Sequence, residues 1–284
     1  MCSTPTYDVL CYGALCIDHR IWLPCHPRPG QGMRVSREDL AAGGNALHEA
    51  RALALWGNKV VLMGDHLGDD PGGNVIWDTI HALPIERAYL VRDPVVQTPR
   101  CYVLITPDAQ RTILAVRDDT TPHTPPSTTL LNNCRLVSLT RYGPQTDRVA
   151  QMARQAGRLL VVGDATRPDD AWARYADVIV SSGELLRQSD ASTDITLRMT
   201  ELHAIRSATV IVTDGPRPVR AIWRTNGELY TVSVTPPSVE TVNTTGAGDV
   251  FRAAVVHGLL RDWPWEQILS FACAEAATYV KRER

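Results

Sequence analysis

The sequence predicts an α/β fold, with a three-layer α/β/α core around a mainly parallel sheet and a small separate sheet beside it. From residue 136 onward, short apolar runs typical of buried strands alternate with helical segments. This alternation is the pattern of a parallel sheet covered on both faces. Earlier strands, within about residues 17–40 and 95–117, have no place in that scheme. We therefore expect these two segments to form the small sheet.

Helices and strands of the N-terminal half are predicted from the spacing of apolar residues and from the turn residues between these segments. Helices are expected over Ala46–Leu55 and Pro71–Leu83. Strands are expected over Asp8–Gly13, Ala14–Leu23, Met33–Leu40 and Lys59–Met63. A later hairpin is expected from two strands, with Pro107 to Gln110 as the turn between Val95–Thr106 and Arg111–Arg117.

The C-terminal half contains the alternating strands and helices of the main sheet. Its expected strands are Leu136–Leu139, Leu159–Gly163, Val178–Ser181 and Val210–Thr213. Residues 239–242 are expected to end a further strand, and helices are expected over Phe251–Leu260 and Trp265–Tyr279. No internal repeat interrupts this order.

Composition limits the classes of partner and compartment. The 284 residues carry 29 Lys and Arg against 31 Asp and Glu, a net charge of −2 that favours neither nucleic acid nor a membrane surface. No apolar run is long enough to span a bilayer, and the first residues lack the pattern of a secretory signal. Seven dispersed cysteines without a CxxC motif favour reduced thiols in the cytoplasm. Cys11, Cys16 and Cys273 are expected to be buried as small hydrophobes.

Lysine is nearly absent, which restricts the chemistry of phosphate binding. The two lysines are Lys59 and Lys281, and neither follows the glycines of a P-loop motif. Any site for phosphoryl transfer in this chain must therefore use backbone amides, a metal ion or arginine.

The most informative segment is residues 243–251, which read NTTGAGDVF. Gly246 and Gly248 allow a tight turn whose amides stay uncovered at the start of the predicted helix. Such a turn binds an anion, because several N–H groups and the helix dipole converge there. Asp249 lies in the first helical turn, where a carboxylate can deprotonate a hydroxyl during phosphoryl transfer. The alternative is a structural turn in which Asp249 only stabilises the helix N-terminus.

Two motifs together resemble the signatures of the ribokinase-like (PfkB) carbohydrate kinases. NTTGAGDVF is similar to the second signature, usually DTTGAGDxF, and Gly43-Gly44-Asn45-Ala46 followed by Gly64 to Asp70 is similar to the first. The resemblance extends from about Tyr7 to Tyr279. It implies one ribokinase-like kinase domain over residues 1–284, in which segments 17–40 and 95–117 form a β-sheet lid over the sugar site.

For the substrate side, the resemblance implies a set of residues that bind sugar hydroxyls. Asp18 matches an aspartate that hydrogen-bonds the sugar, and Arg111 begins an RTI stretch similar to that of ketohexokinase-like members. The other members of the set are Gly43, Gly44, Asn45 and His48. His48 stands where relatives often have Asn, so a structural histidine is the alternative. Asp69 and Asp70 are expected in a turn, with one acid at the start of the next helix.

For the nucleotide side, the resemblance implies ATP and Mg²⁺. The matching positions are Thr213, Gly215, Thr244, Gly246 and Gly248. Glu184 matches the acid of an Asn-x-x-Glu motif that serves Mg²⁺, although Ser181 stands at the place of the Asn. Asn243 replaces the first Asp of the second signature, so the sequence leaves a monovalent-cation requirement open.

The resemblance implies ATP-dependent phosphorylation of a hydroxymethyl group on a small sugar, with a ketose favoured. Asp249 would take the hydroxyl proton, and the turn of Gly246, Ala247 and Gly248 would form the anion hole. A nucleoside or phosphosugar kinase of the same fold is an alternative, as is a sugar- or nucleotide-binding regulator with impaired catalysis. The resemblance also suggests a homodimer that pairs through the lid and a more open adenine pocket.

Overall fold

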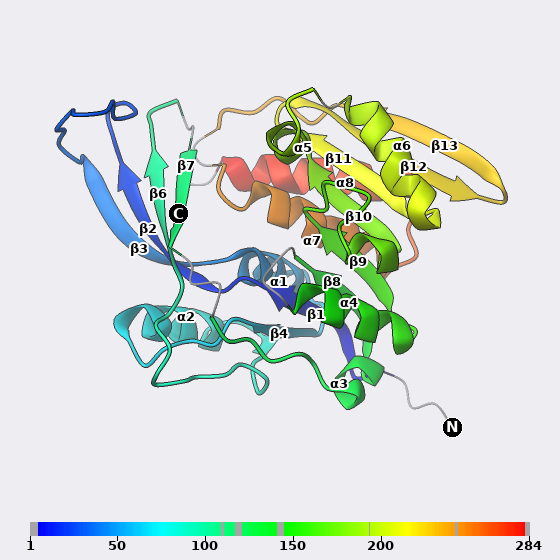
Figure 1. The fold of residues 1–284 in the computed structure, drawn as a ribbon, viewed down its shortest axis with the longest axis horizontal. Coiled ribbons are helices and arrows are strands. Elements are labelled where there is room, and N and C mark those ends of the chain that lie inside the picture. Colours follow the sequence, from blue (N-terminus) through cyan, green and yellow to red (C-terminus); the bar gives the residue numbers. More distant parts are fainter. Residues whose placement is uncertain are drawn as a thin grey trace.

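The protein contains two β-sheets, a large one inside the molecule and a small one beside it (Figure 1). The computed structural model describes residues 5–108, 111–116, 121–140, 145–192, 194–241 and 244–281. The large sheet has nine strands in the order β13-β12-β11-β10-β9-β8-β1-β4-β5. The small sheet has four strands in the order β3-β2-β6-β7.

Strands of the large sheet run parallel from β5 across to β11. The remaining two, β12 and β13, form an antiparallel hairpin on one edge. The bounds are β1 Tyr7–Gly13, β4 Val60–Gly64, β5 Ile85–Glu86, β8 Cys134–Leu139, β9 Leu159–Gly163, β10 Val178–Ser182, β11 Thr209–Asp214, β12 Arg217–Thr225 and β13 Glu228–Val234. The prediction of a mainly parallel sheet is confirmed.

Helices cover both faces of this sheet, because successive strand residues point to opposite sides. Val9 and Cys11 pack in one apolar cluster with helices α1 (Asn45–Leu55), α2 (Pro71–His81), α7 (Ala247–Leu259) and α8 (Trp265–Val280). Leu10 and Tyr12 pack in a second cluster. Its helical elements are α3 (Thr128–Asn132), α4 (Thr146–Gln155), the 3₁₀ turn η1 (Ala173–Tyr175), α5 (Gly183–Ser189) and α6 (Ile195–Arg206). The three-layer α/β/α core is therefore confirmed.

The four-stranded sheet stands apart from the core, at the left of Figure 1. Its strands are β2 Cys16–Trp22, β3 Arg37–Gly43, β6 Arg100–Ile105 and β7 Arg111–Val116. β2 pairs in parallel with β6, whereas the other two pairings are antiparallel. The small separate sheet and the hairpin within it are confirmed, with β3 beginning four residues later than predicted.

Two predictions near the C-terminal half were incomplete or wrong. The hairpin of β12 and β13 was missed, although Asn226-Gly227 between two alternating runs is a strong hairpin signal. Both residues have the positive φ of a type I′ turn, 49° and 83°. The strand expected at 239–242 was wrong for residues 239–241, which are irregular. Pro236 and Pro237 precede them and lack the N–H that a strand ladder needs.

The parallel strands end at one edge of the sheet, and the helices that follow them begin there. α1 follows β3 of the small sheet, and α7 follows the irregular connection after β13. α1 and α7 lie side by side against the sheet. This arrangement brings the two sequence motifs together at the edge where ligands bind in α/β proteins. In the described part of the chain, no helix combines the length and apolar character needed to cross a membrane.

Candidate active site

The glycine turn adopts the conformation that its composition predicts. Gly246 caps α7 with φ 80° and ψ 0°, a left-handed geometry that favours glycine. The Ala247 N–H donates to the Thr244 carbonyl at 3.2 Å, which closes the turn. Gly248 is exposed, and a Cβ atom at this position would meet nothing within 4 Å. A ligand can therefore approach the amides of the first turn of α7, which have no intrahelical acceptors.

Neighbouring side chains leave no room for a Cβ atom at Gly246, which leads to a first prediction. A Cβ atom there would lie 2.7 Å from the Tyr279 hydroxyl and 3.2 Å from Cγ of His48. We expect Gly246→Ala to lower the free energy of unfolding by about 1–2 kcal/mol, the cost of a left-handed L-residue, and to lower turnover as well. The matched control is Gly57→Ala, because Gly57 also has φ 80° but has open space around its Cβ position.

Thermal unfolding and turnover should be measured on both alanine variants. We expect Gly246→Ala to be destabilised more than Gly57→Ala, because its Cβ also meets Tyr279 and His48, and only Gly246→Ala to lose turnover. Equal turnover in the two variants would show that the glycine turn is structural rather than part of the active site.

Asp249 is buried beneath the turn and is paired with polar groups. Arg252, one helical turn further along α7, donates from Nη2 to the Asp249 Oδ1 at 3.0 Å. The side chain of Asn45, at the start of α1, also hydrogen-bonds this carboxylate. Burial raises the pKa of Asp249 above its ordinary value, and the Arg252 charge and these hydrogen bonds offset only part of that shift. A raised pKa makes this carboxylate a stronger proton acceptor than an ordinary exposed aspartate.

Arg252 joins the two motifs through a buried ion-pair network. Its Nε donates to Oε2 of Glu49 on α1 at 3.0 Å, and the two side chains are only 3% and 0% exposed. Burial opposes the charge of Arg252, but the carboxylates of Glu49 and Asp249 raise its pKa above the ordinary value. Its guanidinium packs against Gly163, at the end of β9, where a Cβ would approach within 2.4 Å.

This network was missed from the sequence. Arg252 is the one charged residue in the apolar run FRAAVVHGLL, and it lies three residues after Asp249. That spacing places an acid and a base on the same face of a helix. The role of Glu49 was harder to predict. It stands in the middle of the helix that follows the first motif, and its partner Arg252 is 203 residues away.

The predicted sugar-binding residues also converge on this edge. Asp18 lies on β2, is 6% exposed, and packs its carboxylate over Gly43, where a Cβ would meet Oδ2 at 2.2 Å. Gly44 has φ 103° and abuts the Ala14 carbonyl. Burial raises the pKa of Asp18, while the nearby charge of His48 lowers it and that of Asp249 raises it. Asp18 and Asp249 are therefore close enough to influence each other electrostatically.

Arg111 links the small sheet to the glycine turn. This first residue of β7 donates from Nη1 to the hydroxyl of Thr244, directly before the turn. Its positive charge also lowers the pKa of Asp249. The small sheet therefore contacts the same edge of the core as the glycine turn.

Two of the expected nucleotide residues, Thr213 and Gly215, lie at the end of β11, whereas Thr244, Gly246 and Gly248 belong to the glycine turn. Thr213 is near the end of β11, and Gly215, with φ 61°, begins the tight turn into β12. Partial burial raises the pKa of Asp214 between them, but hydrogen bonds and ion pairs with Arg187 and Arg217 hold it below its ordinary value. The Asp214 carboxylate lies 2.6 Å from Arg187 and 2.8 Å from Arg217.

Glu184 lies apart from the buried network around Asp249. It is exposed in the first turn of α5, where its carboxylate accepts from Gln188 at 3.3 Å. Ser181, at the place of the expected Asn, is buried and donates its hydroxyl to the Ala165 carbonyl. Ser181 is thus engaged within the protein, and Glu184 is the member of this pair that faces solvent.

Two further expectations have clear outcomes. Asp70 caps α2 by accepting from the Gly73 amide at 2.7 Å, and Asp69 pairs with Arg92 at 2.9 Å, so these acids form the structural turn that was predicted. Asn243, on which the question of a monovalent cation rested, lies outside the described residues.

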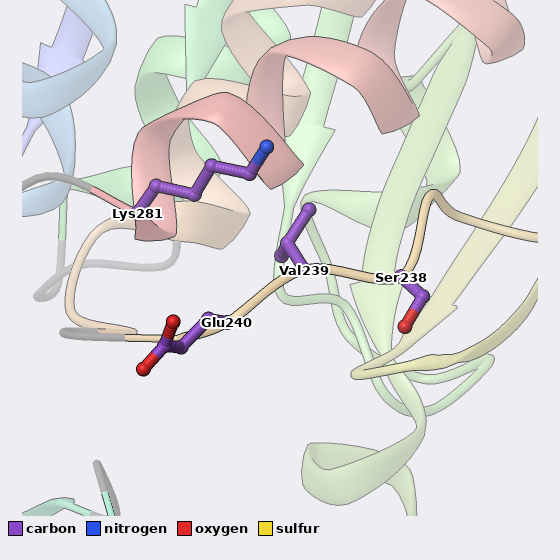
Figure 2. Close-up of a pocket in the computed structure, with 4 residues that line it drawn as sticks. All are labelled: Ser238, Val239, Glu240 and Lys281. Carbon is purple, nitrogen blue, oxygen red and sulfur yellow. The ribbon is translucent and has the colours of Figure 1, made fainter.

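A hollow of about 400 Å³ lies beside the connection from β13 to the glycine turn. It is lined by Ser238, Val239, Glu240 and Lys281, and Figure 2 shows the end of α8 on one side and the connection on the other. The Glu240 carboxylate points away from the Lys281 amine (Figure 2). Lys281 lies two residues after Tyr279, whose hydroxyl lies against Gly246.

Comparison with known proteins assigns the chain to a family. A model of the pfkB family of carbohydrate kinases matches residues 7–284. A ribokinase from Haemophilus influenzae is 20% identical over 285 residues, covering 95% of this chain and 91% of the relative. A fructokinase from Vibrio alginolyticus is 24% identical over 255 residues, covering 81% of each.

The fold is likewise that of a known kinase structure. Ribokinase of Arabidopsis thaliana, solved with ribose and ATP, superposes with a TM-score of 0.80 at 20% identity, over 99% of this chain and 94% of that one. The two glycine motifs, the three-layer core and the small separate sheet thus have one explanation. The chain belongs to the pfkB family of carbohydrate kinases and is a phosphotransferase of the sugar and nucleoside kinase class.

Proposed function

We propose that this protein transfers the γ-phosphoryl group of ATP to a hydroxymethyl group of a small sugar, with a ketose favoured. One observation carries the proposal: a buried carboxylate, Asp249, lies directly below a glycine turn with an open approach at Gly248. A proton acceptor and an anion-binding turn within one helical turn are the two parts that phosphoryl transfer to an alcohol needs.

In the proposed mechanism, Asp249 accepts the proton of the sugar hydroxyl as its oxygen attacks the γ-phosphorus, the bond from that phosphorus to the bridging oxygen breaks, and ADP leaves. Asn45 and Arg252 hold the carboxylate in place by hydrogen bonds. The amides of Gly248 and Asp249 stabilise the charge on the transferring group, and the amide of Ala247 contributes less because it already bonds Thr244. The small sheet, held at the turn by Arg111, excludes the water that would otherwise hydrolyse ATP.

The nucleotide is proposed to lie along the edge from the glycine turn to the end of β11. Gly246 and Gly248 would hold the phosphates, Thr244 would line the turn, and Thr213 and Gly215 would flank the nucleotide. Mg²⁺ bound to the phosphates would neutralise their charge. Glu184 fits a metal held through water, because its carboxylate is exposed beside this edge rather than buried in an ion pair.

The preference for a ketose rests on the RTI stretch at Arg111, on the GGNA motif and on the similarity to a fructokinase. Asp18, Asn45 and His48 supply hydrogen-bonding groups for hydroxyls, with Gly43 and Gly44 allowing close approach of the backbone. A nucleoside or phosphosugar acceptor would use the same edge of the fold.

A panel of acceptors tests the proposed activity. ATP consumption and phosphorylated product should be measured with Mg-ATP and ketoses, aldoses, phosphosugars and nucleosides. We expect at least one ketose to be phosphorylated with the highest kcat/KM. A preference for a nucleoside or phosphosugar would overturn the substrate assignment. Binding of sugar or ATP without any product would instead favour a regulator that has lost catalysis.

Substitution of Asp18 tests the proposed sugar-binding site. We expect Asp18→Asn to raise KM for the sugar by about 10–100-fold, the value of a lost hydrogen bond to a charged group, with KM for ATP unchanged. Asparagine is isosteric with aspartate and fits over Gly43. The matched control is Asp39→Asn on the neighbouring strand β3, where Asp39 pairs with Arg20. Equal KM values for sugar in the two variants would remove Asp18 from the substrate site.

Pairing of two chains through the small sheet is also proposed. β7 is an edge strand, and its Ile113, Leu114 and Val116 side chains are between 43% and 51% exposed. An exposed apolar edge strand is a surface that pairs with another chain. We expect sedimentation velocity to show a dimer for the wild type and a monomer for Leu114→Asp. A monomeric wild type would contradict this proposal.

A further inference from the structure

Two cysteines and an aspartate form a cluster on the small sheet, away from Glu184 and the nucleotide side. Cys16 and Asp18 are two residues apart on β2, so their side chains share one face. Cys101 stands on β6 directly opposite Asp18 in the strand register. One ligand atom from each of the three residues lies within 4.8 Å of the others.

Distances within the cluster match those around a tetrahedral ion. The sulfur atoms of Cys16 and Cys101 are 3.8 Å apart, and Sγ of Cys16 is 3.5 Å from Oδ1 of Asp18. With zinc–sulfur bonds of about 2.3 Å and zinc–oxygen bonds of about 2.0 Å, tetrahedral geometry requires about 3.8 Å between two sulfurs and about 3.5 Å between sulfur and oxygen. Both of these distances are therefore met before any ion binds.

A disulfide between the same cysteines fits the backbone less well. β2 and β6 run parallel with Asp18 opposite Cys101, which places Cys16 two residues away from direct register. At ordinary strand spacing and rise, the two Cα atoms are then about 8 Å apart. Disulfides need about 4.4–6.8 Å between Cα atoms, so a bond would require the strands to shift. Metal coordination does not need the two Cα atoms to approach this closely, and the two measured ligand distances already fit it.

We propose that Cys16, Asp18 and Cys101 form a site for a thiophilic divalent ion of the Zn²⁺ class, and that this ion competes with the sugar for Asp18. The two thiols lose their protons to solvent when the ion binds. Three protein ligands leave the fourth tetrahedral position for water. Thiolate ligands select Zn²⁺ over Mg²⁺, so the Mg²⁺ that accompanies ATP would not fill the site. The competition, unlike the binding itself, rests on the proposed role of Asp18 in the sugar site.

Binding is tested without any catalytic assay, by titrating the whole protein with Co²⁺ in the absence of sugar and ATP. We expect a thiolate-to-cobalt absorption band that Zn²⁺ abolishes by displacement at one equivalent per chain. Cys16→Ser and Cys101→Ser should each weaken binding by at least about tenfold. Cys25→Ser is the matched control, because Cys25 is exposed and outside the cluster. Absence of the band, or a band that survives in the Cys16→Ser/Cys101→Ser double variant, would overturn the site.

Competition is tested by repeating the Zn²⁺ titration with increasing concentrations of the preferred sugar. We expect the apparent affinity for Zn²⁺ to fall as sugar increases, and Zn²⁺ to inhibit the wild type and Cys25→Ser but not Cys101→Ser. Zn²⁺ affinity that is independent of sugar would overturn the competition. A protein that binds Co²⁺ through the two cysteines but phosphorylates no acceptor would disprove the proposed function and still support the metal site.

Discussion

Replacing Arg252 with methionine is expected to lower the free energy of unfolding by about 3–5 kcal/mol. The variant keeps an unbranched apolar stem in place of the arginine stem but leaves Glu49 and Asp249 without the cation that lies 3.0 Å from each. Both carboxylates are almost fully buried, so hydration cannot replace the favourable interaction with Arg252 that each of them loses. Chemical denaturation followed by circular dichroism would measure the change.

A surface ion pair provides the control for Arg252. Arg154→Met removes an arginine that is 41% exposed and lies 3.4 Å from Asp177, and it should change stability little. Adding Glu49→Gln to Arg252→Met removes one of the two stranded charges and should recover part of the loss. If Arg252→Met and Arg154→Met cost the same, the buried network is not what joins α1 to α7.

Replacing Asp249 with asparagine is expected to lower turnover by about 10²–10⁴-fold, the range for loss of a general base. Asparagine preserves the size of the side chain and its bond to Asn45 or Arg252, but it cannot accept the hydroxyl proton. ATP affinity should change little, because the amides of the turn and the residues at the end of β11 are retained. Steady-state kinetics and ATP binding measured on the same preparation would separate the two effects.

Asp177→Asn is the matched control for that experiment. Asp177 is also a hydrogen-bonded acid, which accepts from the Leu160 amide at 2.9 Å, but it precedes β10 and so lies at the opposite edge of the sheet. Its variant should keep turnover within a few-fold of the wild type. Turnover of Asp249→Asn that matches this control would reduce Asp249 to a helix-capping acid, the structural alternative to the catalytic one.

Local rules were sufficient to predict the turn and the layers. Glycine at 246 and 248 required a turn with open amides, and strand–helix alternation required a covered parallel sheet. The position of Asp18 near Asp249, 231 residues further along the chain, could be expected only from the family resemblance. No periodicity in the sequence relates β2 to α7, because their proximity results from how the small sheet docks on the core.

The missed features show where local rules fail. Arg252 is the one charged residue in the largely apolar run of residues 251–260. Its partner Glu49 lies 203 residues earlier in another motif, so local sequence does not reveal the pair. A strand was expected at 239–242, but residues 239–241 are irregular and follow two prolines. By contrast, the Asn226-Gly227 turn was a readable local signal. The sequence therefore contains enough local information to predict the hairpin of β12 and β13.

The proposed role of Asp249 as proton acceptor below the glycine turn is tested most directly by the pH dependence of phosphoryl transfer. Single-turnover rates with Mg-ATP and the preferred sugar avoid control by product release. Burial raises the pKa of Asp249, so its ionised form, and the rate with it, should be lost as pH falls through a value above the ordinary aspartate pKa of about 3.9. A rate that stays constant down to that ordinary value would contradict the role assigned to Asp249.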